Sequence, residues 1–206
     1  MSPAHAPSAA AAPARGRPRD PEVDRRILAA ALAVYEEAGW SGFTFESVAR
    51  AAGVGKPGLY RRWSSREDLL FDAVDIRLPA HDLADTGTVR GDLIAMAQEL
   101  LDGHVRGRSA AMDRLQVEAA VHPRLGRIHA KLVQSRRTPS RAMVLRGIDR
   151  GELRTDTPIT LVLDLVAGAV ANHWRNALPA ERATLLAARD DYVAAAVDAA
   201  LASFLR

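Results

Sequence analysis

The sequence contains no cysteine, only two lysines, and few aromatic residues, which occupy 5% of its 206 positions. Without cysteine the chain has neither a disulfide framework nor a thiolate site, which fits a cytoplasmic protein. No apolar run approaches the roughly 18 residues that a membrane-spanning helix needs. Residues 1–15 also lack the early positive region and the leucine-rich core of a signal peptide. We therefore expect a globular cytoplasmic chain with no membrane partner.

Strand-like and enzyme-like patterns are absent as well. No segment shows convincing alternation of apolar and polar residues, so the expected fold class is all-α. The motifs H-E-x-x-H and G-x-S-x-G do not occur, and the six histidines are scattered along the chain. Residues 53–58 match the G-x-G-x-x-G pattern of dinucleotide-binding loops, but that pattern requires a preceding strand, and helical periodicity precedes this one. An enzyme is the main alternative from another class, yet we expect no catalytic residue, no cofactor and no metal site.

One stretch, residues 43–69, has the pattern of a helix-turn-helix. Apolar residues recur at helical spacing up to Ala52, Gly53 interrupts them, and residues 59–63 resume the pattern one short helix later. The second helix begins at Lys56 and carries positive and aromatic side chains, as a helix that enters the major groove of DNA would. An ordinary helical corner without any DNA contact is the alternative.

The charge distribution favours DNA binding. Residues 15–66 contain ten basic and six acidic residues, whereas the remainder from residue 67 contains eighteen basic and nineteen acidic residues. The net positive charge therefore lies with the helix-turn-helix, as contact with phosphates requires. The candidate DNA contacts are Arg17, Arg19, Thr44, Lys56, Pro57, Gly58, Tyr60, Arg61, Arg62 and Arg66.

Two of these assignments leave alternatives open. Arg17 and Arg19 belong to a short basic arm that either reaches a groove of DNA or stays in solvent. Thr44 is placed to cap the next helix together with Ser47, and its hydroxyl either also meets a phosphate or serves the cap alone.

The patterns divide the chain into three parts. Residues 1–19 are rich in alanine and proline and are expected to form a disordered basic tail. Residues 20–78 are expected to form the DNA-binding domain, with a first helix that ends at Gly39, and residues 79–206 a second helical domain. Within the second domain we expect helices over about 88–106, 109–121, 124–150, 158–177 and 183–206. Pro139 should break or kink the third of these.

Three groups of residues carry a resemblance to a known family: Ala52-Gly53-Val54, Leu59-Tyr60-Arg61-Arg62-Trp63 and Ser65-Arg66-Glu67-Asp68-Leu69-Leu70. This pattern resembles the tetracycline-repressor (TetR/AcrR) family of bacterial transcription regulators. The resemblance is specific over about residues 20–78 and weaker afterwards, where residues 150–154 are similar to the turn between helices seven and eight of many members.

The resemblance implies a three-helix DNA-binding domain, a variable helical domain that holds a small effector, and a dimer formed by the last two helices. It also implies phosphate or base contacts by five residues and a packing role for Trp63 beneath them. The five residues are Thr44, Lys56, Tyr60, Arg62 and Arg66. Gly55 and Gly58 stand where members commonly have hydroxyl residues, so hydroxyl contacts are lost there.

The function that we expect is a ligand-responsive, sequence-specific transcriptional regulator, a repressor that a small molecule releases from its double-stranded DNA operator. A ligand-independent DNA-binding protein is the alternative. Candidate effector contacts combine apolar bulk with a few polar groups on helices that should converge. They are Met96, Leu100, His104, Met112, Leu115, Glu118, Met143, His173 and Trp174.

The two C-terminal helices each carry an apolar stripe. The first stripe contains Leu161, Leu165, Ala169, Val170 and Trp174, and the second contains Tyr192, Val193, Ala196, Val197, Ala200, Leu201 and Phe204. Such stripes predict a homodimer through residues 158–206, with a four-helix bundle at its centre. The alternative is that both stripes face the core of their own chain.

Overall fold

The computed structural model describes residues 20–77 and 85–205, so Arg17 and Arg19 lie outside the described residues. The described part is helical, which confirms the all-α fold class, and its one β-bridge joins Leu153 to Leu205. The helices are α1 (Pro21–Gly42), α2 (Phe45–Ala52), α3 (Lys56–Tyr60), α4 (Arg66–Arg77), α5 (Val89–Val105), α6 (Ala110–Ala119), α7 (Pro123–Asp149), α8 (Ile159–Asn176), α9 (Arg182–Ala187) and α10 (Arg189–Leu201).

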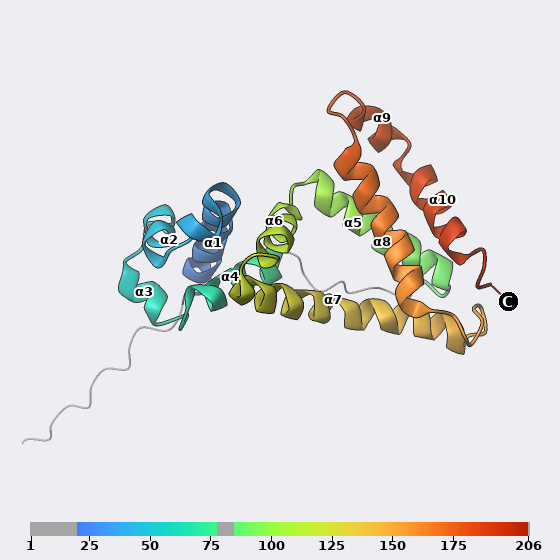
Figure 1. The fold of residues 1–206 in the computed structure, drawn as a ribbon, viewed down its shortest axis with the longest axis horizontal. Coiled ribbons are helices and arrows are strands. Elements are labelled where there is room, and N and C mark those ends of the chain that lie inside the picture. Colours follow the sequence, from blue (N-terminus) through green and yellow to red (C-terminus); the bar gives the residue numbers. More distant parts are fainter. Residues whose placement is uncertain (1–19, 78–84, 206) are drawn as a thin grey trace, which may run out of the picture.

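The molecule is elongated, with helices α1 to α4 at one end and α8 to α10 at the other (Figure 1). The long helix α7 runs along one side and connects the two ends, and α5 and α6 lie between them. Gly39 has a φ of +63° and interrupts α1 where an end was predicted, so the last turn of that helix changes direction.

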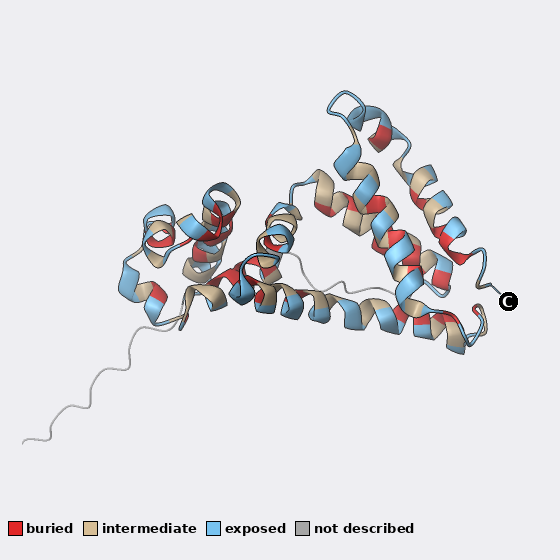
Figure 2. Cartoon of the chain, viewed as in Figure 1, coloured by how far each residue is buried: buried red, intermediate tan, exposed pale blue. Residues whose placement is uncertain are grey.

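Two hydrophobic cores occupy the two ends (Figure 2). The first core consists of buried side chains of α1 to α4, with Ala111 and Leu115 from α6 and residues 125–132 from the first half of α7. The second core consists of buried side chains of α5, α8 and α10, with Met143 and Val144 from the second half of α7. Helix α7 therefore contributes to both cores, and the first core extends well past residue 78.

Helix α7 is continuous through Pro139, so the predicted break is wrong. Proline removes one backbone N–H donor and leaves the carbonyl four residues earlier without its helical partner, here that of Ser135. Because Ser135 is exposed, water can satisfy this carbonyl. Leu132 anchors the helix in the first core and Met143 anchors it in the second, so packing on both sides of the proline offsets its cost.

The C-terminal pattern that was predicted as one helix forms two, α9 and α10, which meet at Ala188. The predicted dimer stripes also need correction. Val170, Val193, Val197 and Leu201 are at most 1% exposed and belong to the second core of their own chain, so they cannot contact a partner. The apolar side chains that remain accessible on α8 lie on a different face of that helix.

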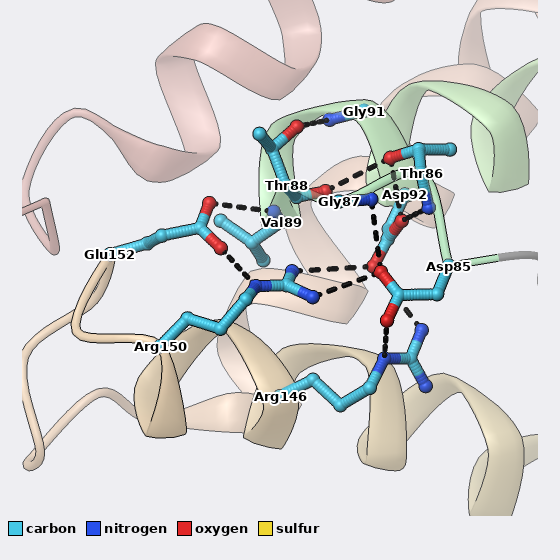
Figure 3. Close-up of polar contacts among 10 residues, drawn as sticks. All are labelled: Asp85, Thr86, Gly87, Thr88, Val89, Gly91, Asp92, Arg146, Arg150 and Glu152. Atoms are coloured by element: carbon cyan, nitrogen blue, oxygen red, sulfur yellow. Dashed lines mark hydrogen bonds and ion pairs between the residues drawn. The ribbon is translucent and has the colours of Figure 1, made fainter.

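A cluster of charged residues joins the start of α5 to the end of α7 (Figure 3). The carboxylate of Asp92 is fully buried and accepts hydrogen bonds from the backbone N–H and the hydroxyl of Thr86, both at 2.7 Å. Guanidinium nitrogens of Arg146 and Arg150 lie 3.2 Å and 3.6 Å from the same carboxylate. Because a buried charge is tolerated only when it is paired and hydrogen-bonded, this cluster fixes the segment that precedes α5 against α7.

The same two helices approach closely at Gly147 of α7. A Cβ atom at this position would lie 2.6 Å from the Cβ of Val89, so a larger residue would push the helices apart. The helices α5 and α7 also border, together with α6 and α8, a cavity that is described below.

Candidate nucleic-acid interface and effector cavity

A capping pair and a glycine determine where α2 begins and where the chain turns toward α3. The Thr44 side chain accepts a hydrogen bond from the backbone N–H of Ser47 at 3.0 Å, and the Ser47 hydroxyl accepts one from the backbone N–H of Thr44 at 3.0 Å. This reciprocal pair caps α2, as predicted. Gly53 then ends α2 with a φ of +64°, a conformation that glycine adopts without steric cost. The chain turns there, and α3 begins at Lys56.

Helix α3 has one buried and one exposed side. Leu59 is completely buried in the first core and holds the helix against α2. Pro57, Tyr60 and Arg61 are exposed on the outer side. Tyr60 is 61% exposed, and its ring packs edge-on against Phe45 with 4.7 Å between the ring centroids. Tyrosine and arginine side chains that project from a fixed helix are suited to contact the edges of bases or the backbone of DNA.

A surface hollow of about 300 Å³ lies beside α3. It is lined by Thr44, Phe45, Glu46, Lys56, Tyr60 and Arg66. The Lys56 ammonium lies 2.9 Å from the Glu46 carboxylate, and this hydrogen bond, together with the lysine charge, lowers the pKa of Glu46. Hydroxyl groups and two cations around one hollow can receive a phosphate, for which Lys56 would exchange its bond to Glu46.

Two predicted DNA contacts are engaged inside the domain instead. The Arg62 guanidinium donates hydrogen bonds to the carboxylate of Asp24 and, at 2.9 Å, to the backbone carbonyl of Gly58. Its side chain is only 15% exposed. Arg62 therefore fastens α3 to α1, and the predicted contact of Arg62 with DNA would require it to leave Asp24.

Arg66 is also committed to the protein. Its guanidinium lies 3.8 Å from the centre of the Trp40 ring and donates a hydrogen bond to the backbone carbonyl of Phe43 at 3.1 Å. Cation-π and hydrogen-bond contacts of this kind fix the start of α4 against the end of α1. Trp63 packs beneath α3 as predicted, because it is 6% exposed and its indole N–H donates to Asp72 at 2.8 Å.

One cation that the sequence argument did not select is Arg50, which is exposed in the last turn of α2. It lies three positions before Gly53, at the start of the turn that leads to α3. The position of Arg50 near the end of α2, just before α3, was readable from the sequence. Arg50 belongs with Lys56 and Arg61 among the accessible cations.

A second candidate site is a cavity of about 610 Å³ bordered by α5, α6, α7 and α8. Ligand pockets of about 300–1,000 Å³ are typical of small-molecule sites. Of the nine predicted effector contacts, the structure brings Met96, Leu100 and Met112 together around this cavity. The polar residues that border it, among them Arg137, Arg141 and Thr160, were missed because only the fold brings α7 and α8 next to these methionines.

The other predicted effector contacts lie elsewhere. Leu115 is fully buried in the first core, and Met143 is fully buried in the second. Trp174 packs against the second core, and the guanidinium of Arg182 lies 4.9 Å from its ring centre. None of these side chains borders the cavity between α5 and α8, so the expected convergence of all nine residues is wrong.

The two candidate histidines are also separated from that cavity. His104 lies 2.7 Å from the Ser109 hydroxyl, and burial holds its pKa below the ordinary value although Asp113 is nearby. His173 stacks on Tyr192 with 3.8 Å between ring centroids and borders another cavity, of about 650 Å³, formed by residues of α8, α9 and α10. Neither histidine therefore shares a site with the methionines.

Helix α6 connects the cavity to the DNA-binding end. Met112 and Gln116 of α6 border the cavity, while Glu118 on the same helix accepts a hydrogen bond from the Tyr35 hydroxyl at 2.8 Å. The Glu118 carboxylate also accepts one from the backbone N–H of Trp40 at 3.2 Å. Burial and the bond to Glu118 raise the pKa of Tyr35, which keeps the phenol protonated. A displacement of α6 would therefore act directly on α1.

Other kinds of site find no support in the part of the chain that the structure describes. Within residues 20–77 and 85–205, no group of three or more His, Asp or Glu side chains is arranged to hold a metal ion. No helix in these ranges is long and apolar enough to cross a membrane.

Most of the chain matches known protein families and known proteins. Residues 27–73 match the family described as bacterial regulatory proteins, tetR family, and residues 83–200 match the family described as tetracyclin repressor-like, C-terminal domain. The HTH-type transcriptional regulator AqdR of Rhodococcus erythropolis is 34% identical over 157 residues, which are 76% of each chain. The DNA-binding transcriptional repressor TetR of Mycobacteroides abscessus is 31% identical over 71% of this chain and 78% of its own.

Solved structures share the fold. A TetR-family transcriptional regulator from Rhodococcus sp. aligns with a TM-score of 0.67 and 20% identity over 88% of this chain and 99% of its own. The matched families together span both hydrophobic cores, and the helix-turn-helix with its exposed α3 lies within the first matched range. The chain therefore belongs to the tetR family of bacterial regulatory proteins and is a DNA-binding transcriptional regulator.

Proposed function

We propose that the protein is a homodimeric, cytoplasmic repressor that binds an operator through α3 and leaves it when a small molecule fills the cavity between α5 and α8. We propose further that it acts by binding and carries out no catalysis. The observation that carries the DNA-binding part is the geometry of α3, in which Leu59 anchors the helix while Tyr60 and Arg61 project outward.

The proposed DNA contacts are the accessible members of the predicted set. They are Thr44, Lys56, Pro57, Gly58, Tyr60 and Arg61, joined by Arg50. Thr44 and Lys56 border the hollow beside α3, where a phosphate would complete their hydrogen bonds. Tyr60 would contact base edges in the major groove, and Arg61 would contact a phosphate.

Dimerisation is proposed through α8 and α10, with Leu161 and Leu165 of the predicted first stripe but without the buried Val170. Leu161 and Leu165 of α8 are 47% and 45% exposed, and Gly168 one turn further on is also exposed. These three residues lie at helical spacing on one face of α8. A second copy that covers this face would place two α3 helices on two half-sites about 34 Å apart, as dimeric helix-turn-helix proteins require.

Ligand response is supported by the cavity and by the contacts of α6. A molecule that enters the cavity touches Met112 and Gln116, and α6 holds α1 through Glu118. Ligand binding can shift an equilibrium only if the two states differ in affinity for the ligand. Helix α6 borders the cavity on one side and contacts the DNA-binding end on the other. A shift of α6 would therefore change the affinity for the ligand and the position of α1 together.

The experiment selects DNA fragments with the purified full-length protein and then measures the affinity of variants for the selected operator. Tyr60→Ala should weaken binding by about 1–3 kcal/mol, and affinity should fall steeply with salt. Leu178→Ala is the matched control, since Leu178 is 62% exposed at the opposite end of the molecule and should leave affinity unchanged. Equal operator affinity of the parent and Tyr60→Ala would show that α3 is not the recognition helix.

A ligand-independent DNA-binding protein is the second candidate. It is distinguished by screening small molecules for release of the operator. The repressor proposal requires at least one compound that both binds the cavity and lowers operator affinity.

A further inference from the structure

The charge of α7 is unusual for a helix that carries none of the proposed DNA contacts. Helix α7 carries seven arginine and lysine residues and a single acidic residue, Asp149. Four of the seven cations pair with a carboxylate or lie over an aromatic ring: Arg124 pairs with Glu67 at 3.2 Å, Lys131 lies over the Phe71 ring at 5.9 Å, Arg136 pairs with Asp75 at 3.7 Å, and Arg146 pairs with Asp92 at 3.2 Å.

The remaining three cations, Arg127, Arg137 and Arg141, have no carboxylate partner among residues 20–77 and 85–205. Arg137 and Arg141 both border the cavity between α5 and α8. They lie four residues apart on one face of α7, where like charges repel each other. The fold thus holds two uncompensated positive charges side by side at the edge of this cavity.

The rest of the border combines apolar and polar side chains. The apolar ones are Met96, Leu100, Met112, Val133, Leu163 and Ala167, and the polar ones are Gln116, Gln134, Arg136, Ser140, Thr160 and Asp164. Met96, which is 3% exposed, borders the cavity together with Leu100 and Met112. Arg141 donates a hydrogen bond to the Thr160 hydroxyl at 3.1 Å, which directs its guanidinium along the opening toward α8. Asp164 is the acidic residue that borders the cavity, and it forms no ion pair with either arginine.

An apolar interior with a positive edge selects for a molecule of matching polarity. A guanidinium binds a carboxylate through two parallel N–H···O bonds, and such charge-assisted bonds are about twice as strong as neutral ones. Amines would be repelled by the pair, and a neutral apolar molecule would leave the arginines without an anion.

We propose that the cavity binds an amphipathic carboxylate, with its chain or ring against Met96, Leu100 and Met112 and its carboxylate at Arg137 and Arg141. This inference rests on the proposed function, because it names the chemical class of the effector. At neutral pH a carboxylic acid is ionised, so the anion is the species that binds.

The experiment measures binding of decanoate and naphthoate to the full-length protein by calorimetry, with decanol and decylamine as neutral and cationic controls. The parent should bind a carboxylate about tenfold or more tightly than decanol, the ratio expected from charged hydrogen bonds. The double variant Arg137→Gln/Arg141→Gln should lose this preference and keep its affinity for decanol. Arg127→Gln, an exposed and equally unpaired arginine of the same helix outside the cavity, should behave as the parent.

The proposal is overturned if neither carboxylate binds, if decanol or decylamine binds as tightly as decanoate, or if the double variant retains the preference. Operator binding is measured with the same samples, which separates this proposal from the one on which it rests. A protein that binds its operator but no carboxylate loses only the chemical class proposed here. Conversely, carboxylate binding that depends on the two arginines but leaves operator affinity unchanged supports the cavity assignment and contradicts ligand-controlled repression.

Discussion

The two hydrophobic cores differ in composition and in how polar groups anchor them. The first core buries four aromatic side chains, Tyr35, Trp40, Phe43 and Trp63, whereas the buried residues of the second are aliphatic or methionine. Two of the four aromatic residues also donate side-chain hydrogen bonds to carboxylates, at 2.8 Å in both cases. Aromatic pairs and directed hydrogen bonds restrict a core to one arrangement, while aliphatic side chains of similar volume repack more easily.

This difference corresponds to what each end of the molecule is proposed to do. A recognition helix must be held in one position, and Leu59 fixes α3 directly on the aromatic core. The second core lies beside a cavity, and Met96 belongs to that core and also borders the cavity. We infer that the first core provides a rigid platform and that the second tolerates the adjustments that accompany ligand binding.

The largest effect is expected from a charge placed in the second core. Val166 of α8 is completely buried, whereas its neighbour Leu165 is 45% exposed. Val166→Glu should abolish folding of the second core, because an unpaired buried charge costs several kcal/mol. Leu165→Glu, combined with Leu161→Glu, should instead give a folded monomer. Circular dichroism and sedimentation distinguish the two results, and a Leu161→Glu/Leu165→Glu variant that stays dimeric would place the interface elsewhere.

Large-to-small substitutions should have the next largest effect on stability, and the effect should differ between the two cores. Phe43 is completely buried against the rings of Tyr35 and Trp40, so Phe43→Ala should cost about 3–5 kcal/mol of the free energy of unfolding. Val193→Ala removes two carbon atoms from the second core and should cost about 1.5–2 kcal/mol. Urea denaturation followed by tryptophan fluorescence measures both, since Trp40 and Trp63 report on the first core and Trp174 on the second. A cost of Phe43→Ala below about 3 kcal/mol would contradict the tight packing proposed for the first core.

Loss of the contact between α6 and α1 should have an intermediate effect on the free energy of unfolding, and this effect should depend on pH. Burial raises the pKa of Glu118, but hydrogen bonds from Tyr35, Arg114 and the backbone of Trp40 outweigh it and leave the pKa below its ordinary value of 4.5. The ionised carboxylate therefore stabilises the fold above pH 4.5, and this contribution is lost as the pH falls through the lowered pKa. Glu118→Gln should cost about 1.5–3 kcal/mol at pH 7.

Unfolding measurements of the parent and Glu118→Gln at several pH values check this prediction. The difference in the free energy of unfolding should shrink as the pH falls below 4.5, because the parent carboxylate then becomes protonated while glutamine does not titrate. A difference that stays constant with pH would show that the charge of Glu118 does not contribute to stability and that only the shape of its side chain does.

The sequence predicted features whose signals are local. The cap at Thr44, the turn at Gly53 and the buried Leu59 lie within sixteen residues of one another, and the structure places each as the pattern indicated. By contrast, the break between α9 and α10 falls at Ala188, between Ala187 and Arg189, and alanine and arginine favour helices, so neither glycine nor proline marks it. The continuity of α7 through Pro139 depends on packing against two cores that the sequence does not reveal.

The candidate sites were predicted less completely, because a residue type does not show which partner it has in the fold. Arg62 pairs with Asp24, 38 residues away, and Arg66 stacks on Trp40, 26 residues away, so both looked available for DNA. The basic character of α7 was hidden for another reason. The eighteen basic and nineteen acidic residues from residue 67 onward nearly balance, so their sum does not show that α7 is basic, and only the fold brings two of its arginines to the cavity.

The smallest predicted effect distinguishes an arginine that serves the first core from one that serves DNA. Arg61 and Arg62 are adjacent, but Arg61 is exposed with no protein partner in the described part of the chain, whereas Arg62 fastens α3 to Asp24 of α1. Arg61→Ala should leave the free energy of unfolding unchanged and lower operator affinity by about 1 kcal/mol, with a salt dependence reduced by about one phosphate contact.

Arg62→Ala should show the opposite pattern in the unfolding measurement. It removes a charged hydrogen bond and should lower the free energy of unfolding by about 1–2 kcal/mol. Its effect on operator binding should follow from the loosened α3 and leave the salt dependence of the affinity as it is in the parent, because no phosphate contact is lost. If Arg62→Ala instead reduced the salt dependence and Arg61→Ala did not, the two arginines would have exchanged roles, with Arg62 leaving Asp24 for a phosphate when DNA binds.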